Sequence, residues 1–311
     1  MFRALRRPVT CLLIIAFAAG VGAVESRPAA LVFLSDFGLT ERFVASMKGV
    51  ALSVDPSLQI YDLTHQIEPF NIWQASYMLA GTIEYWPKGT VFVSVVDPGV
   101  GTDRRSVVAK TNSGHYVVTP DNGTLTLVAD AQGIQSLRQI DEKLNRRPGS
   151  DDSHTFHGRD VYSYTGARLA AAVIKFDDVG PVLEPNIVRL NYQQPAKLDD
   201  NTIFGNVTHI EMPFGNVVTN IPKSLVDALA LSPEDNSIVL VEISRAGESV
   251  FRQKIPYALS FGYVDEGQPV LYSDSLQTIG LAVNSGNFSS QFGVQAGAEW
   301  TIRLIRMAVP E

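Results

Sequence analysis

Cysteine is almost absent from this chain of 311 residues: the one cysteine, Cys11, lies in an apolar segment near the N-terminus. A single cysteine excludes an intrachain disulfide. Positive charge is also scarce, because 25 lysines and arginines face 32 acidic residues, and no basic tract suits nucleic acid. HExxH, Walker and CxxC patterns are missing too. We therefore expect no metal site, no redox cofactor and no nucleic-acid partner.

The first 23 residues are typical of a secretory signal peptide. Three arginines precede an apolar run of eleven residues from Cys11 to Val21, and small residues end the segment at Ala23. The run is shorter than the ~20 residues that a membrane-spanning helix needs, so we rank a membrane-anchored N-terminus below a signal peptide. We expect cleavage after Ala23, export to a periplasmic or extracellular location, and no membrane attachment afterwards. Cleavage takes away Cys11 and changes the formal charge from −7 to −10.

Apolar sequence is plentiful, at 45% of residues, and its pattern predicts two domains. From residue 28 to 182, strand-like and helix-like segments alternate, which favours an α/β domain with a largely parallel central sheet. Segments 105–111 and 115–120 read as a hairpin within it. The expected strands are 30–34, 59–63 and 90–96, and the expected helices are 41–54, 72–86 and 158–174.

Residues 183–200 are polar, contain proline and show no periodicity, so we interpret them as a linker. From residue 201 to 311 short β-rich segments follow one another, separated by glycine and asparagine. This pattern predicts a smaller C-terminal β-barrel domain.

Three polar residues of the first domain stand where ligands bind in open α/β sheets. Asp36 and Asp97 directly follow two apolar strands, and His157 precedes the last long helix. Each has an ordinary explanation, since Asp36 could cap a helix and His157 could be a polar loop residue. Asp97 also opens a turn, DPGVG, in which Gly99 and Gly101 would let backbone approach a ligand closely, and Arg104 follows it. The convergence of two carboxylates, an imidazole and a guanidinium at one rim favours a functional site.

Seven motifs occur in order along nearly the whole chain after the leader: SDFG, MKG, VDPGVGT-x-RR, TPDNG, TFHGRD, FGN-x-x-TNI and AVNSGN. Together they resemble the S-adenosyl-L-methionine hydroxide adenosyltransferases, which are S-adenosylmethionine hydrolases related to fluorinases and chlorinases. The resemblance implies that water attacks the ribose 5′ carbon of S-adenosylmethionine, releasing adenosine and methionine. It also implies a homotrimer with ligand sites between neighbouring subunits.

The resemblance assigns roles to nine residues. Asp97, Arg104 and His157 match the trio that handles the water. Six further residues match the family's substrate contacts: Asp36 at the ribose diol, Phe70 beside the nucleoside, Glu211 at the methionine ammonium, Asn216 at the adenine, Ser275 at the methionine end, and Val283 at the adenine through its backbone. The sulfonium substrate needs no acid for its neutral leaving group, so the reaction requires only a base and an orienter, and Asp or His can supply the base.

Two departures and two alternatives accompany this resemblance. Glu211 stands where the family usually has aspartate, and Phe43 stands where some relatives have a polar contact. The halogenating relatives carry tyrosine at the position of Asp97 and serine at that of Gly158, so this chain sides with water as the nucleophile and a halogenase is disfavoured. An exported binding protein without turnover is the other alternative, and the intact water-handling trio argues against it.

Overall fold

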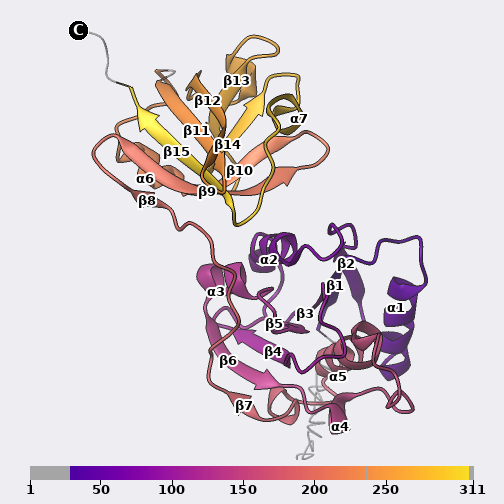
Figure 1. The fold of residues 1–311 in the computed structure, drawn as a ribbon. Coiled ribbons are helices and arrows are strands. Elements are labelled where there is room, and N and C mark those ends of the chain that lie inside the picture. Colours follow the sequence, from indigo (N-terminus) through magenta and orange to yellow (C-terminus); the bar gives the residue numbers. More distant parts are fainter. Residues whose placement is uncertain (1–28, 236, 308–311) are drawn as a thin grey trace, which may run out of the picture.

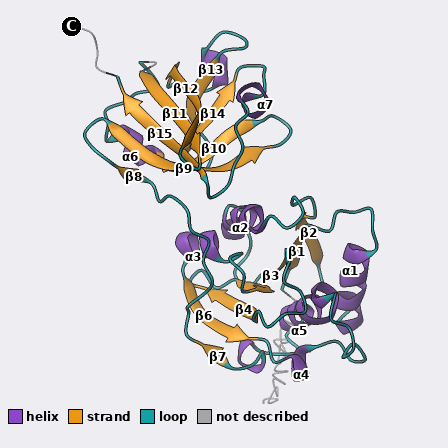
Figure 2. Ribbon diagram, in the orientation of Figure 1, coloured by secondary structure: helices purple, strands orange, loops and turns teal. Residues whose placement is uncertain are grey.

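The computed structural model describes residues 29–235 and 237–307, which form two parts joined by a single segment (Figure 1). In that view the first part, indigo to magenta, lies below the second, which runs from orange to yellow. Figure 2 shows helices around the sheet of the first part, and mostly strands in the second. The expected signal peptide, residues 1–23, lies outside the described residues.

The first part is built on a seven-stranded sheet of order β2-β1-β3-β5-β4-β6-β7. β2, β1, β3 and β5 run parallel, whereas β4, β6 and β7 pair antiparallel with their neighbours. The prediction of a largely parallel sheet is therefore right for one half and wrong for the other, because the tight turn at 112–114 reverses the chain between β4 and β5. The strands are β1 Leu31–Ser35, β2 Ile60–Thr64, β3 Val91–Val95, β4 Ser106–Thr111, β5 Tyr116–Pro120, β6 Ile134–Gln139 and β7 Val182–Leu183.

Helices cover both faces of this sheet. Alternate strand residues point to opposite faces, so Leu31 and Phe33 pack with Met47 of α1, whereas Val32 and Leu34 pack with Leu79 of α2. The two buried layers make this a three-layer α/β/α unit. The helices are α1 Phe43–Val54, α2 Ile72–Ala80, α3 Thr126–Gln132, α4 Glu142–Asn145 and α5 Tyr164–Ala170, with short helical turns η1 Ile83–Tyr85, η2 Gly158–Ser163 and η3 Phe176–Asp178.

Two predicted helices are shorter or less regular than the sequence indicated. The helix expected at 72–86 ends at Ala80, and the separate turn η1 follows Gly81. The helix expected at 158–174 begins as a π-helical turn, η2, and continues as α5 only to Ala170. π-Helical turns are rare and are found frequently at functional sites. This one starts next to His157.

The second part is an antiparallel, nearly closed barrel. Its strands follow the order β12-β11-β15-β9-β10-β14-β13, with β8 paired to β9, and a bridge between Tyr257 and Leu271 links the two ends. Apolar side chains from alternate strand positions fill its interior. The elements are β8 Ala196–Lys197, β9 Thr202–Glu211, β10 Asn216–Pro222, α6 Lys223–Asp227, β11 Ile238–Arg245, β12 Glu248–Pro256, η4 Phe261–Tyr263, β13 Pro269–Ser273, β14 Thr278–Val283, α7 Phe288–Phe292 and β15 Trp300–Arg306.

The segment between the two sheets is tied to the first part rather than free. Val188 donates its backbone N–H to Asp121, and Leu190 donates to Thr126. The two parts also touch directly, because Trp73 Nε1 donates to the Thr208 carbonyl at 2.7 Å.

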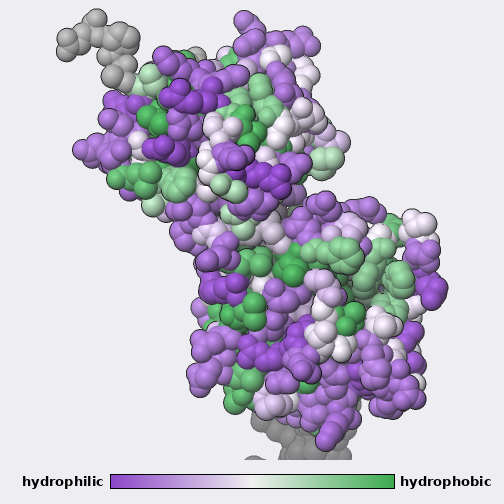
Figure 3. All heavy atoms as spheres, viewed as in Figure 1, coloured by the Kyte–Doolittle hydropathy of each residue, from purple (hydrophilic) through white to green (hydrophobic). Residues whose placement is uncertain are grey.

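The surface in Figure 3 is mostly hydrophilic, with separate hydrophobic patches on both parts. In the described ranges, no helix combines the length and the apolar character needed to cross a membrane.

Candidate active site

The turn after β3 places Asp97 at the carboxyl end of the parallel strands. Val100 donates its N–H to the Asp97 carbonyl, and Asn122 Nδ2 donates to the Val96 carbonyl at 2.9 Å, which fixes the strand end just before Asp97. Gly101 has φ of +78°, and a Cβ there would lie 2.6 Å from the His154 carbonyl oxygen. Gly101 is therefore required by the neighbouring loop, whereas Gly99 has ordinary room for a side chain. Close approach to a ligand is not needed to explain either glycine.

Asp97, Arg104 and His157 are in direct contact, although 53 residues separate the last two in sequence. Arg104 donates from Nε to Oδ1 of Asp97 at 2.6 Å and from Nη2 to Oδ2, and the same Nη2 lies 3.2 Å from His157 Nδ1. The side chain of Asp97 is 3% exposed. Burial alone would lower the pKa of Arg104, but the hydrogen bonds to Asp97 and the electrostatic effects of Tyr162, Asp97 and Glu142 together outweigh it and raise that pKa. The guanidinium thus stays charged and fixes the carboxylate through two charge-assisted bonds.

Two further side chains of this network were not predicted from the sequence. Tyr162 in η2 donates its hydroxyl to Asp97 Oδ2 at 3.3 Å, and its oxygen lies 3.1 Å from Ser106 Oγ. Ser106 also accepts from Arg104 Nη1 at 3.2 Å. Burial raises the pKa of Tyr162 above its ordinary value, so the phenol keeps its proton and remains a donor. No local sequence motif indicates that these two residues contact Asp97 and Arg104, because Tyr162 occupies an ordinary apolar position of the predicted helix.

The second arginine of the pair serves a different purpose. Arg105 Nη2 bonds to Asp121 Oδ2 and donates to the Asn186 carbonyl at 3.0 Å, while Asp121 Oδ1 accepts from the Val188 N–H. Arg105 therefore joins the TPDNG loop to the segment between the domains. Of these two consecutive arginines, Arg104 points into the site and Arg105 points toward the linker.

Asp36 and Phe70 lie at the same pocket as Asp97 and His157. The cavity has a volume of ≈260 Å³, and its further lining comes from Phe37, Phe43, Pro69, Val95, Val100, Thr155, Phe156 and Gly158. Phe70 has φ of 69° and donates its N–H to Asp36 Oδ2 at 2.9 Å, so the carboxylate holds the aromatic residue in an unusual backbone conformation. Burial raises the pKa of Asp36, and the charge of Asp97 adds to this rise, while the Phe70 N–H opposes it.

The wall of the pocket is aromatic and tightly packed. Phe37, Phe43 and Phe156 contact one another with ring centroids 5.4–5.8 Å apart. A Cβ on Gly158 would lie 3.2 Å from both Phe37 and Val95, which leaves little room for a side chain at this position. Phe43, noted above as a departure, is thus part of an apolar wall beside the polar trio.

The residues expected from the C-terminal domain do not line this pocket. Asn216 and Val283 line a second cavity of ≈460 Å³, and Asn216 Nδ2 donates to Glu211 Oε2 at 3.1 Å across the β9–β10 pair. Ser275 lines neither cavity; it is an exposed residue of the turn between β13 and β14. Within one chain the nine residues therefore form two separate groups, with Ser275 in neither. The expectation that ligand sites lie between neighbouring subunits stays a prediction.

Among residues 29–235 and 237–307, no three His, Cys, Asp or Glu side chains are grouped as a metal site would require. The expectation that no cofactor is needed remains a prediction.

Two family models match the chain in sequence order. The SAM hydroxide adenosyltransferase N-terminal domain matches residues 31–180, and the C-terminal domain of the same family matches residues 205–301. The chain belongs to the SAM hydroxide adenosyltransferase family. The predicted resemblance is thereby confirmed. The first matched range covers β1 to β6, and the second covers most of β9 and all of β10 to β14.

Named relatives of this chain fall into two groups. A protein named (R)-S-adenosyl-L-methionine hydrolase from Methanocaldococcus jannaschii is 39% identical over 196 residues, covering 62% of this chain and 66% of that protein. A protein of the same name from Salinispora tropica is 34% identical, covering 85% of this chain and 94% of that protein. A fluorinase from an Actinoplanes species is 25% identical, covering 88% and 96%.

A solved structure agrees with the fold of this family member. The crystal structure of an uncharacterized conserved protein from Thermotoga maritima superposes with a TM-score of 0.79 at 35% identity, covering 89% of this chain and all of that one. The α/β unit followed by a barrel is thus shared along both domains.

Proposed function

We propose that this protein is an S-adenosyl-L-methionine hydrolase that forms adenosine and L-methionine. Water oxygen bonds to the ribose C5′ while the C5′–sulfur bond breaks, its electron pair stays on sulfur, and methionine leaves as a neutral thioether. The water gives up one proton to a base of the site. Relatives named as hydrolases, at 32–39% identity, support this reaction over halogenation.

The single observation that carries the proposal is the contact of Asp97, Arg104 and His157 at the rim of an apolar pocket. A carboxylate fixed by a guanidinium can orient a water molecule, and an apolar wall favours the merging of opposite charges between a developing hydroxide and a sulfonium. Asp36, across the same pocket, has the two acceptor oxygens that suit a ribose diol.

Asp97 is the residue that we assign as proton acceptor. Asp97 Oδ1 accepts one bond from Arg104 and keeps a lone pair for a water proton, whereas Oδ2 accepts from both Arg104 and Tyr162. Both ring nitrogens of His157, in contrast, lie 3.2 Å from guanidinium nitrogens. Protonation of the ring would therefore place a third cation between two others.

A complete site requires a second copy of the chain in our proposal. The pocket around Asp97 is lined by first-domain residues alone, and the cavity of Asn216 and Val283 by second-domain residues alone. Phe70 and Phe214, one at each cavity, are 70% and 66% exposed. A homotrimer in which one subunit's first cavity meets the next subunit's second cavity would bury both aromatic rings and supply Glu211 and Asn216 to the substrate.

Incubation of the protein with each sulfonium epimer of S-adenosylmethionine, with and without halide, tests the function. We expect adenosine as the only nucleoside product, with no 5′-halo-adenosine and no loss of activity upon chelation. Asp97→Asn should lower turnover by ~100-fold or more, as for the loss of a proton-transfer group, while substrate binding persists. Halide-dependent product or a strict metal requirement would contradict the proposal.

Export remains part of the proposal, on the sequence of residues 1–23 alone. An exported protein that binds the substrate without turnover is the alternative function. Equilibrium binding of S-adenosylmethionine with no adenosine formed over hours would favour that alternative.

A further inference from the structure

The ring of His157 is held from both sides. Its Nδ1 faces Arg104, as described above, and its Nε2 lies 3.2 Å from Nη2 of Arg146. Arg146 is the residue that ends α4, a helix of the loop between β6 and η2, and it is not part of any motif singled out in the sequence. His157 itself is 6% exposed, so these two guanidiniums form much of its polar surroundings.

Arg146 is fixed in turn by its own partners. Nη2 donates to Glu142 Oε2 at 2.6 Å, one helical turn earlier, and Nη1 donates to the carbonyls of Ser150 and Ser153 at 3.2 and 3.0 Å. The Arg146 side chain is 10% exposed. A buried guanidinium with three acceptors in place has one orientation, so its remaining Nη2 hydrogen is directed at the imidazole.

Two donors facing one ring decide which form of the ring is stable. A neutral imidazole can accept at one nitrogen, whereas an imidazolium must donate at both, and neither guanidinium can accept. The charged groups around the ring are Glu142 and Arg146 on one side and Asp97 and Arg104 on the other. Burial lowers the pKa of His157, Arg104 and Arg146 lower it further, and Glu142 and Asp97 oppose them.

We propose that Arg146, held by Glu142, is a positioning residue that keeps the His157 imidazole neutral and fixes its ring plane against Arg104. The proposal rests on the proposed function only in taking His157 as part of the reacting site. A neutral ring leaves Asp97 as the acceptor of the water proton. It also keeps one positive charge fewer beside the cationic sulfonium of the substrate.

The two members of the pair should have opposite effects when each is neutralised. Arg146→Gln removes a cation but leaves the Glu142 carboxylate near Nε2, so the pKa of His157 should rise by about one pH unit or more. Glu142→Gln removes the anion and should lower it. Arg146→Lys keeps the charge and should restore most of the low value. If Arg146 and Glu142 had only a structural role, their substitutions would not shift the pKa of His157 in opposite directions.

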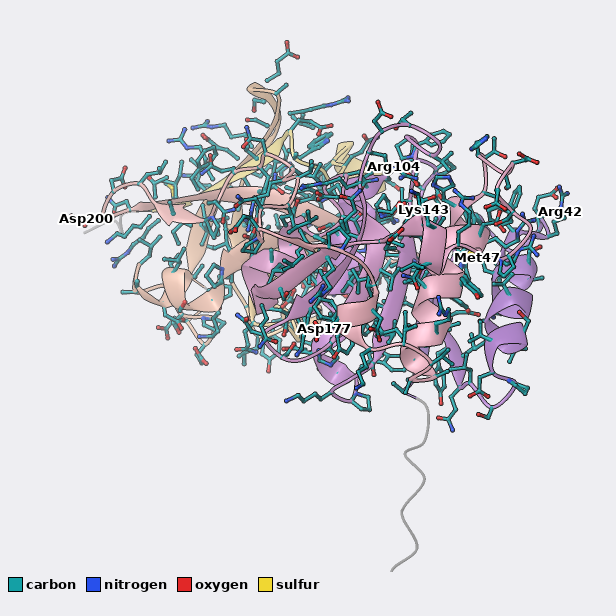
Figure 4. All side chains as sticks on the ribbon, turned by 90° about the horizontal axis from the view of Figure 1, so that it is seen from below. Arg42, Met47, Arg104, Lys143, Asp177 and Asp200 are labelled. Atoms are coloured by element: carbon teal, nitrogen blue, oxygen red, sulfur yellow. The ribbon has the colours of Figure 1, made fainter. Side chains whose placement is uncertain are left out.

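Lys143→Gln is the matched control. Lys143 belongs to α4, which Arg146 directly follows, is exposed, and carries the same charge as Arg146. Its backbone N–H donates to Asp141, and within the described residues no hydrogen bond or ion pair joins it to His157. Figure 4 labels Lys143 and Arg104. NMR titration of the His157 ring in the full protein, assigned with His157→Gln, gives the pKa in each variant. We expect Lys143→Gln to leave that pKa unchanged.

The pH profile of kcat provides the second measurement. If the neutral ring is needed, the acid limb should move to higher pH in Arg146→Gln and follow the pKa measured by NMR. Unchanged titration in both Arg146→Gln and Glu142→Gln, with hydrolysis intact, would overturn the inference and leave the proposed function standing. Opposite shifts in a protein that forms no adenosine would support the inference and refute the function.

Discussion

Arg104 donates hydrogen bonds to both carboxylate oxygens of Asp97, from Nε to Oδ1 at 2.6 Å and from Nη2 to Oδ2. The fork geometry of a guanidinium matches a carboxylate in a way that an ammonium cannot, so the pair defines the direction of the free lone pair on Asp97 Oδ1. Asp97 can therefore aim a water molecule only as accurately as Arg104 holds it.

Replacement of Arg104 by lysine should lower kcat far more than it weakens substrate binding. The positive charge is kept, but the two parallel bonds and the contact with Ser106 are lost, and we expect kcat to fall by ~100-fold. Steady-state kinetics check this. Arg105→Lys is the matched control, because Arg105 bonds to Asp121 and the linker; it should lower Tm by a few degrees with kcat nearly unchanged. Equal losses of kcat in the two variants would show that the paired hydrogen bonds from Arg104 to Asp97 are not needed for turnover.

Alanine at Gly158 should narrow the pocket. Its Cβ would lie 3.2 Å from Phe37 and Val95, closer than ordinary packing, so one of these side chains must shift. Crowding of this kind costs about 1–3 kcal/mol of stability. We expect a lower Tm and a KM raised several-fold, with adenosine still the product. An unchanged KM would mean that substrate does not approach this wall.

Substrate binding should weaken in acid through Asp36. Because burial raises its pKa above the ordinary 3.8, the carboxylate that would accept from the ribose diol is lost at a higher pH than for an exposed aspartate. KM should therefore rise as pH falls through that raised pKa. Asp36→Asn should have a high KM that no longer changes over this range. A KM that rises identically in Asp36→Asn would assign the titration to another group.

The contact between the domains should lose stability in mild acid. His209 stacks on Tyr77 with ring centroids 4.4 Å apart, and burial lowers its pKa to about 4. The unfolded chain takes up a proton near pH 6.5, before the folded protein does, so stability is complete above that pH and declines as pH falls toward about 4. Tm measured across this window should decline less steeply in His209→Gln. Parallel curves for both proteins would exclude His209 as a source of the decline.

The charge of Glu211 should matter to the affinity for substrate and not to the chemical step. Glu211 accepts from Asn216, which lines the second cavity. Glu211→Gln should raise KM by ~10-fold through loss of a charge-assisted bond to the substrate ammonium, with kcat nearly constant. Glu211→Asp, which keeps the charge, should lie between. A fall in kcat alone would place this residue elsewhere in the reaction.

The sequence allowed some of this site to be found because of one regularity. Asp36 and Asp97 each follow a buried apolar strand, and the carboxyl ends of parallel strands lie at one edge, so their proximity could be predicted without a structure. The roles of Arg146 and Tyr162 could not be predicted from the sequence. Arg146 follows the short helix α4 and Tyr162 lies in the π-helical turn η2, and neither segment has a sequence pattern that indicates which way its polar side chains point. The antiparallel strands β6 and β7 were missed for a similar reason: β6 carries polar residues on both faces, and β7 has only two residues.

Hydrolysis in heavy-oxygen water is the most direct test of the central claim, that a water molecule directed by Asp97 attacks the ribose C5′. The labelled oxygen should appear at the 5′ hydroxyl of adenosine, and Asp97→Asn should reduce its rate of incorporation by ~100-fold while substrate still binds. Adenosine without label, methylthioadenosine from cleavage on the other side of sulfur, or undiminished incorporation in Asp97→Asn would contradict it.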